Sequence, residues 1–202
     1  MRTKYKPWAK PYLDEHQEIS ISLEEIKNLS NVYLEIGSGK GDFILKMAEK
    51  FPQYTFIGVE KNVTCAGISA KKIVESGLTN IKLLWIDAIN LLPLFQDESI
   101  SYIFLNFSDP WPKRRHHKRR LTSEIFLNEY YRVLVKGGKL IFKTDNIDLF
   151  NDSLEYFTEN NLFTLVNKTN NYLGDDEFDA QTEYEEYFRK EGTPINRVIY
   201  QK

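Results

Sequence analysis

Three closely spaced glycines follow a short apolar run near the start of the chain, and their spacing restricts the ligand that they could hold. The run is Val32–Ile36, and the glycines are Gly37, Gly39 and Gly41. A dinucleotide-binding loop has glycines at positions i, i+2 and i+5, but here the third glycine comes at i+4 and Asp42 occupies i+5. An aspartate at the start of the following helix would repel a pyrophosphate, and the sequence has no P-loop pattern here. The loop therefore fits a nucleoside ligand that carries a positive charge and no phosphate.

Carboxylates stand at the ends of three successive apolar runs, at Glu35, Glu60 and Asp87. S-adenosylmethionine is a nucleoside of the required charge. Glu35 suits its amino group and sulfonium, Glu60 suits the two ribose hydroxyls, and Asp87 suits the exocyclic amine of adenine. Each acid taken alone could equally cap the helix that follows it. Three acids in register after three strands favour one shared ligand.

A dense basic segment follows the sequence Asp109-Pro-Trp-Pro. Residues 113–120 hold six of the chain's 27 Lys and Arg residues, so 21 remain elsewhere against 29 acidic residues, although the whole chain has a net charge of only −2. A basic patch on an acidic body attracts a polyanion to one place, and its cations bind phosphates. A solvated surface is the alternative interpretation. A metal site at His116 and His117 is disfavoured because no cysteine lies nearby, so we expect no metal.

The elements that must position these residues alternate between strand and helix. The expected strands are Val32–Ile36, Tyr54–Val59, Ile81–Ile86, Ser101–Phe107 and Lys139–Lys143. The expected helices are Asp42–Lys50, Asn62–Ser76, Thr122–Leu134 with Thr122 as cap and Gly137-Gly138 as terminator, and Asn146–Asn160. Leu162–Lys168 and Asn196–Tyr200 predict a closing hairpin, with a short helix at Glu183–Lys190 between them. This alternation predicts an α/β fold with helices on both faces of a mostly parallel sheet and the ligand beyond the carboxyl ends of the strands.

The length of 202 residues suits one domain, residues 1–202, in which the basic residues 1–12 are expected to form a mobile arm. No apolar run approaches the roughly 20 residues of a membrane span, and the N-terminus lacks the apolar core of a signal peptide. Cys65 is the single cysteine, which is typical of a reducing compartment. We therefore expect a cytoplasmic protein with no membrane partner.

The sequence resembles the bacterial tRNA (guanine-N7)-methyltransferases, which modify the variable-loop guanosine at position 46 of tRNA. The resemblance covers nearly the whole chain, and its most specific segment is Asp109–Arg120. It extends to the segments Lys6–Ala9, Glu35–Gly41, Gly58–Glu60, Asp87-Ala88, Lys143–Asp145 and Thr182–Glu185. One departure is Ser108, where the family more often has a proline.

The resemblance implies a Rossmann-like class I methyltransferase fold with a seven-stranded sheet. It implies that S-adenosylmethionine contacts four acids, which we expect to act together with two glycines of the loop: Glu35, Glu60, Asp87, Asp109, Gly37 and Gly39. It implies substrate contacts from Lys113, Asp145, Thr182, Glu183, Tyr184 and Glu185. It also implies RNA contacts from Arg115, His116, His117, Lys118, Arg119 and Arg120.

Methylation at guanine N7 needs no general base, because N7 carries an in-plane lone pair and no proton. The residues must therefore position the base and stabilise its developing charge. Asp109, to which we assign the catalytic role, Asp145 and Glu185 are the candidates to accept hydrogen bonds from the guanine edge. We expect the base to be extruded from folded tRNA. Trp111 and Tyr184 could then stack on it, or they could pack in the core.

Three other functions remain as alternatives on the sequence alone. A methyltransferase acting on an exocyclic amine of adenine would often present Asp/Asn-Pro-Pro-aromatic in place of Asp109-Pro-Trp-Pro. An RNA-binding protein without activity is disfavoured by the set of cofactor residues, and a nicotinamide-dependent reductase by Asp42. The aromatic content makes a homodimer a further hypothesis.

Overall fold

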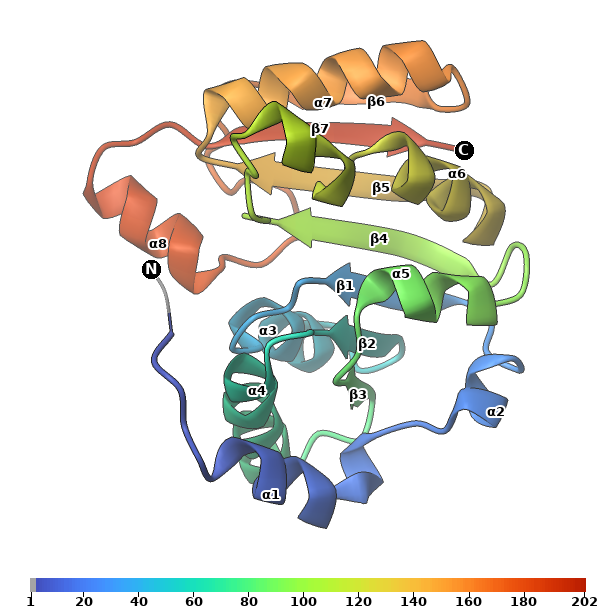
Figure 1. Cartoon of the computed structure of the whole chain (residues 1–202), viewed down its shortest axis with the longest axis vertical. Helices are drawn as coiled ribbons and strands as arrows, with labels where there is room; N and C mark the ends of the chain where they lie inside the picture. The colour runs from blue at the N-terminus through green and yellow to red at the C-terminus, as the bar shows by residue number, and fades with distance from the viewer. Residues whose placement is uncertain (1–2) are drawn as a thin grey trace.

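The computed structural model describes residues 3–202, which build one seven-stranded sheet (Figure 1). The strand order is β3-β2-β1-β4-β5-β7-β6, in which β1 to β5 pair in parallel and β7 runs antiparallel to both neighbours. The strands are β1 (Val32–Ile36), β2 (Thr55–Val59), β3 (Ile81–Leu84), β4 (Ile100–Asn106), β5 (Leu134–Thr144), β6 (Thr164–Thr169) and β7 (Asn196–Gln201). The predicted mostly parallel sheet with a C-terminal antiparallel hairpin is confirmed.

Helices cover both faces of this sheet, as the alternating pattern predicts. One face packs against α1 (Ala9–Glu15), the 3-10 helix η1 (Gln17–Ile19), α3 (Asp42–Lys50) and α4 (Val63–Ser76). The other packs against α2 (Leu23–Ile26), α5 (Ala88–Leu91), η2 (Leu92–Leu94), α6 (Glu124–Val133) and α7 (Ile147–Asn160). The 3-10 helix η3 (Arg114–Arg119) follows β4, and α8 (Glu183–Lys190) lies beyond the carboxyl ends of the parallel strands (Figure 1). No helix within residues 3–202 is both long and apolar enough to span a membrane.

An aromatic cluster on the α3/α4 face anchors the segment that precedes α8. Phe178 lies 4.7 Å from Tyr102 and 5.4 Å from Tyr33, measured between ring centroids. Tyr33 in turn stacks on Tyr54 at 4.6 Å and on Tyr102 at 5.2 Å. Because these tyrosines come from β1, β4 and the turn before β2, the cluster holds residue 178 against the middle of the sheet.

The N-terminal residues are more ordered than the sequence pattern predicts. Residues 1–2 of the expected arm lie outside the described part of the chain, but residues 9–12 belong to α1. Ala9 is fully buried against Gly67 of α4, where a Cβ atom would lie 2.4 Å from the Ala9 Cβ. The expectation of a mobile arm is therefore wrong for residues 9–12, because the missing side chain at Gly67 allows α1 to dock.

The boundary between α6 and β5 also differs from the prediction. Ser123, not Thr122, occupies the N-cap position, and α6 ends at Val133 without reaching the two glycines. Gly137 and Gly138 lie inside β5, which starts at Leu134. A Cβ at Gly138 would come within 2.8 Å of a backbone oxygen, so a close backbone contact, and not a helix end, requires this glycine.

Replacing Gly67 by alanine tests whether α1 is held by this close contact. Gly67→Ala should displace α1 and lower the free energy of unfolding by about 1–3 kcal/mol, partly offset by the gain of about 1 kcal/mol in helix propensity. Thermal unfolding and limited proteolysis of residues 3–15 measure the effect. The control is Lys71→Ala, an exposed position on the same helix. Equal proteolysis of the two variants would show that α1 does not depend on the Gly67 contact.

Candidate functional site

The carboxyl ends of β1 to β5 meet along one edge of the sheet, and this edge collects the predicted acids. Glu35 is the penultimate residue of β1, Glu60 directly follows β2, and Asp145 directly follows β5. Asp87 and Asp109 each come three residues after a strand end. The sheet therefore brings all five carboxylates to the side on which α8 lies (Figure 1).

Three left-handed glycines shape the loop between β1 and α3. Gly37, Gly39 and Gly41 have φ angles of 78°, 56° and 82°. The Gly41 position also has no room for a side chain, since a Cβ there would lie 2.3 Å from the Ser69 hydroxyl oxygen. Asp42, the first residue of α3, pairs with Lys72 at 2.8 Å. At these three positions the loop therefore presents backbone, and not side chains, to the carboxyl edge of the sheet.

Glu35 is a buried carboxylate with one unpaired oxygen. Its side chain is 3% exposed, and its Oε1 accepts a hydrogen bond of 3.0 Å from the Asn106 amide. Its Oε2 has no hydrogen-bond partner within the described chain. Burial raises the pKa of Glu35 to about 7. A buried acceptor without a partner is costly, so this oxygen fits a ligand that brings a donor or a positive charge, such as the amino group of S-adenosylmethionine.

Glu60 and Asp87 have local hydrogen bonds as well as a position for ligand binding. Glu60 accepts from the Gly39 amide at 2.9 Å and from the Asn62 amide at 2.6 Å, and burial raises its pKa. Asp87 is the N-cap of α5 and accepts from the Ile89 amide at 3.3 Å. The helix-capping role considered from the sequence is therefore real for Asp87. A carboxylate has about four lone-pair positions, so both residues retain acceptors for a ligand.

The loop after β4 holds Asp109 in an exposed position between two residues with unusual backbone angles. Phe107 has a φ of 51° and Trp111 a φ of 43°, in the left-handed region that side chains other than glycine rarely adopt. Asp109 lies close enough for its charge to contribute to the raised pKa of Glu60, after the larger effect of burial. Asp145 is half-buried, and burial raises its pKa.

The predicted substrate residues at the start of α8 differ in their surroundings. Thr182 caps the helix by accepting from the Glu185 amide at 2.8 Å, and Glu183 pairs with Lys40 of the glycine loop at 2.8 Å. Tyr184 is 37% exposed, and its ring stacks on Phe107 at 6.1 Å. Neither Tyr184 nor Trp111 belongs to the two apolar cores of residues 3–202, but Tyr184 is exposed whereas Trp111 is half-buried.

Glu185, in contrast, is buried and fully paired. It is 1% exposed, with one oxygen 3.1 Å from the Lys143 ammonium and the other 2.7 Å from the Arg189 guanidinium. Lys143 also contacts both oxygens of Asp179, at 2.8 and 2.9 Å. The structure therefore does not bring Glu185 to the guanine edge, and it assigns this residue to an internal ion-pair network.

The basic segment divides into exposed and buried members. Lys113, Arg115, Lys118 and Arg119 are exposed, and His116 and His117 are half-buried. Arg120 is only 3% exposed. Its guanidinium donates to the Pro110 carbonyl at 2.8 Å, to Asp152 at 2.5 Å and to the Tyr156 hydroxyl at 2.9 Å. Arg120 therefore stabilises the loop from within. The expectation that it contacts RNA is wrong, because its guanidinium is buried and already hydrogen-bonded.

Three residues of the site have roles that the sequence analysis did not assign. Asn106 orients Glu35, and Lys143 with Asp179 holds α8. A lysine inside the apolar run of β5 and an asparagine at the end of β4 were the available signals, because a polar residue in a strand buried on both faces needs a partner. Nothing in the sequence near Asp179 indicated that it would be this partner.

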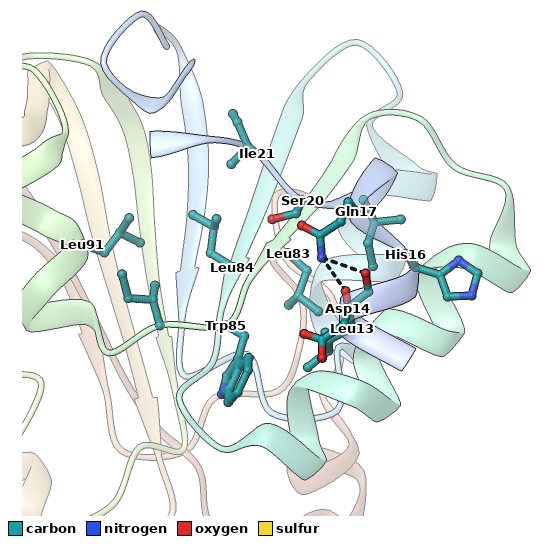
Figure 2. A pocket seen from close by; sticks show the side chains of 12 residues that line it. Leu13, Asp14, His16, Gln17, Ser20, Ile21, Leu83, Leu84, Trp85 and Leu91 are labelled. Atoms are coloured by element: carbon teal, nitrogen blue, oxygen red, sulfur yellow. Dashed lines mark hydrogen bonds between the residues drawn. The ribbon is translucent and has the colours of Figure 1, made fainter. Parts of the chain in front are cut away.

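A hollow of about 240 Å³ lies at the edge of the sheet, away from these acids (Figure 2). It opens between the end of α1, η1 and the chain around β3. Its lining contains none of the predicted site residues. The candidate functional site is therefore the carboxyl edge of the sheet, where the unpaired oxygen of Glu35 lies.

Comparison with known proteins finds similarity to methyltransferases. Residues 30–198 match a family model described as "Putative methyltransferase". The chain is 42% identical to a tRNA (guanine-N(7)-)-methyltransferase of Oceanobacillus iheyensis, over 98% of this chain and 97% of the relative. It is also 42% identical to the protein of the same name from Staphylococcus saprophyticus, over 98% of each chain.

Solved structures show the same fold at low sequence identity. The 16S rRNA methyltransferase KamB matches with a TM-score of 0.65 and 14% identity, over 88% of this chain and 91% of that one. An antibiotic-related methyltransferase matches with a TM-score of 0.63 and 18% identity, over 91% and 94% of the two chains. These matches confirm the predicted Rossmann-like methyltransferase fold.

The raised pKa of Glu35 predicts a specific dependence of stability on pH. The folded pKa, about 7, exceeds the ordinary glutamate value of 4.5, so the contribution of Glu35 is fully present below pH 4.5 and is lost as the pH rises through about 7. The free energy of unfolding of Glu35→Gln relative to the wild type should therefore increase by roughly 1–3 kcal/mol as the pH rises from 5 to 8, because glutamine does not ionise. Urea unfolding without ligand at several pH values measures this difference. The control is the exposed Glu155→Gln, and parallel curves for Glu35→Gln and wild type would contradict the prediction.

Proposed function

We propose that this chain, which belongs to the tRNA (guanine-N(7)-)-methyltransferase family, transfers a methyl group from S-adenosylmethionine to N7 of a guanosine in tRNA. The observation that carries the proposal is the buried, unpaired oxygen of Glu35 beside a loop of left-handed glycines. This arrangement suits a cationic amino-acid group and leaves no favourable place for a pyrophosphate. The exposed cations of η3 lie on the loop that carries Asp109, so a phosphate-rich substrate would approach the same edge of the sheet.

The residues that would hold S-adenosylmethionine fit its parts in turn. Glu35 accepts from the amino group, Glu60 from the ribose hydroxyls and Asp87 from the adenine amine, while Gly37 and Gly39 leave room for the ligand beside the backbone. When bound, S-adenosylmethionine supplies a methyl group made electrophilic by its sulfonium. A bound cation also favours the ionised form of Glu35, whose pKa burial has raised.

The reaction needs the protein to orient guanine and to balance charge. The N7 lone pair forms a bond to the methyl carbon as the carbon–sulfur bond breaks, so the positive charge moves from sulfur to the base and no proton leaves. Asp109 and Asp145 form no ion pair within residues 3–202, so their carboxylates can accept hydrogen bonds from the guanine N1–H and 2-amino group. Their negative charge also stabilises the cationic product base. Lys113 and Tyr184 complete the proposed substrate contacts.

The substrate is proposed to be the variable-loop guanosine at position 46 of tRNA. The exposed members of the basic segment would bind the phosphates around it, and the aromatic rings of Phe107 and Tyr184 offer a surface on which the extruded base could stack. We infer a cytoplasmic location from the proposed tRNA substrate. The exposed edge strand β6, with Leu165 and Val166 at the surface, supports a homodimer as part of the proposal.

The proposed acceptor atom is tested with a tRNA that carries 7-deazaguanine at the target position. This base has no N7 lone pair, so it should receive no methyl group while the tRNA still binds. Wild-type protein, labelled methyl donor and unmodified tRNA serve as the positive control, with nucleoside identification as the measurement. Methylation of the analogue at the wild-type rate would instead support an exocyclic amine as the acceptor.

The division of the basic segment predicts two different kinds of variant. Replacing Arg115, Lys118 and Arg119 together by alanine should weaken tRNA binding and reduce the log–log salt dependence by about 0.7–0.9 for each phosphate that the variant no longer binds. Arg120→Ala should instead lower the free energy of unfolding by roughly 1–3 kcal/mol, because it removes buried hydrogen bonds to a charged group. Salt titrations of tRNA binding and thermal unfolding separate the two effects. A triple variant with unchanged salt dependence would mean that these cations are only a solvated surface.

A further inference from the structure

Cations and tryptophans alternate along the surface between α1 and η3. The Lys10 ammonium lies 5.9 Å from the centroid of the Trp85 ring. Lys61 follows, its carbonyl accepting from the Trp85 indole at 3.2 Å and its ammonium lying 5.7 Å from the Trp111 ring. The Arg119 guanidinium lies 5.1 Å from the same ring. These five residues form what we call the cation–aromatic row.

Separate parts of the fold build the cation–aromatic row, and four of its five side chains are exposed, whereas that of Trp111 is half-buried. Trp85 is 42% exposed, and Lys10, Lys61 and Arg119 are exposed. Figure 2 shows Trp85 projecting beside α1, where it lines the same hollow as Asp14. Trp85 keeps a large apolar area in contact with solvent although its indole hydrogen bond holds it in place, and exposed cation–π pairs contribute only about 0.5–1 kcal/mol. Internal stability alone therefore does not account for the row.

Two members of the cation–aromatic row, Lys61 and Trp111, lie close in the chain to residues of the proposed reaction. Lys61 directly follows Glu60, and Trp111 lies two residues after Asp109. A ligand on the row would therefore be continuous with a base held at Asp109. The ligand that suits the row is a run of unpaired nucleotides, whose bases stack on aromatic rings while their phosphates contact the intervening cations.

The charge along the row is positive in sum. Lys10 is paired with Asp14 at 2.6 Å, so its charge is partly neutralised. Lys61 and Arg119 form no salt bridge within residues 3–202, although the charge of Lys61 acts on neighbouring Glu60. The two cations that flank Trp111 therefore remain free to contact phosphates, and Lys10 can be shared between Asp14 and a phosphate.

We propose that the cation–aromatic row binds unpaired nucleotides of the tRNA next to the methylated guanosine, with bases stacked on Trp111 and Trp85. This inference rests on the proposed function and extends the tRNA contact from η3 to α1. It also assigns different roles to Trp111 and Tyr184. Tyr184 stacks near the target base, whereas Trp111, which already lies under two cations, receives a neighbouring nucleotide.

The first test removes the outer stacking platform. Trp85→Ala should weaken tRNA binding by roughly 5- to 160-fold, the range expected for the loss of one base stack, and Trp85→Phe should restore most of the affinity. Binding of S-adenosylhomocysteine, measured on the same proteins, should not change. Wild-type tRNA affinity in Trp85→Ala would overturn the proposal.

The second test compares two matched lysines. Lys10 and Lys71 are both exposed helix residues paired with an acid four positions later, but only Lys10 lies over a row tryptophan. Lys10→Gln should reduce the salt dependence of tRNA binding by up to about 0.7–0.9, and Lys71→Gln should leave it unchanged. Equal behaviour of the two variants would overturn the extension of the contact to α1.

A third measurement does not depend on loss of function. In the double variant Trp8→Phe/Trp111→Phe, Trp85 is the one remaining tryptophan of the three, and its fluorescence should be quenched when tRNA binds. Unchanged fluorescence at saturating tRNA would overturn the stacking role of Trp85.

Methylation of unmodified tRNA by the wild type is measured in the same series. If N7-methylguanosine forms but the row variants bind tRNA normally, the inference about the cation–aromatic row fails and the proposed function stands. If the wild type transfers no methyl group, the proposed function fails, and the inference that rests on it fails too.

Discussion

The buried ammonium of Lys143 is the interaction on which the arrangement of the site depends. This side chain lies in the middle of the sheet with no exposed surface. A buried charge is tolerated only when it is paired and hydrogen-bonded, so Lys143 requires the carboxylates of Asp179 and Glu185. Both come from the segment after β6, which therefore folds back across the sheet. Arg189 supplies the second positive charge that the two carboxylates need.

The same segment is attached to the helix that follows the glycine loop. Lys46 and Lys50 of α3 donate to backbone carbonyls of residues 177, 179 and 181, and Lys40 pairs with Glu183. Phe178 of this segment belongs to the aromatic cluster on the α3/α4 face of the sheet. The proposed cofactor loop and the proposed substrate residues are consequently parts of one connected structure, although about 140 residues separate Lys40 from Glu183 in the chain.

Local patterns were sufficient to predict most of the sheet and its acidic edge. The boundaries of β1, α3 and α8 agree with the predicted ones, because short strands, glycine loops and caps are encoded in adjacent residues. The roles of Arg120 and Glu185 could not be predicted in this way. In sequence, Arg120 resembles its basic neighbours, and only the packing of α7 supplies Asp152 and Tyr156 as its partners. The docking of α1 likewise depends on a contact between Ala9 and Gly67, far apart in the chain.

The position of β7 between β5 and β6 has a consequence for how the chain folds during synthesis. Residues 196–201 are made after both of the strands that they join. Until they leave the ribosome, β5 has an open edge on one side and β6 has no partner strand. Such unpaired edges expose a nascent chain to wrong pairing. Strands β5 and β6 can therefore pair with β7 only after residues 196–201 have been made, and the stacking of Tyr200 on Phe157 of α7 also requires these residues.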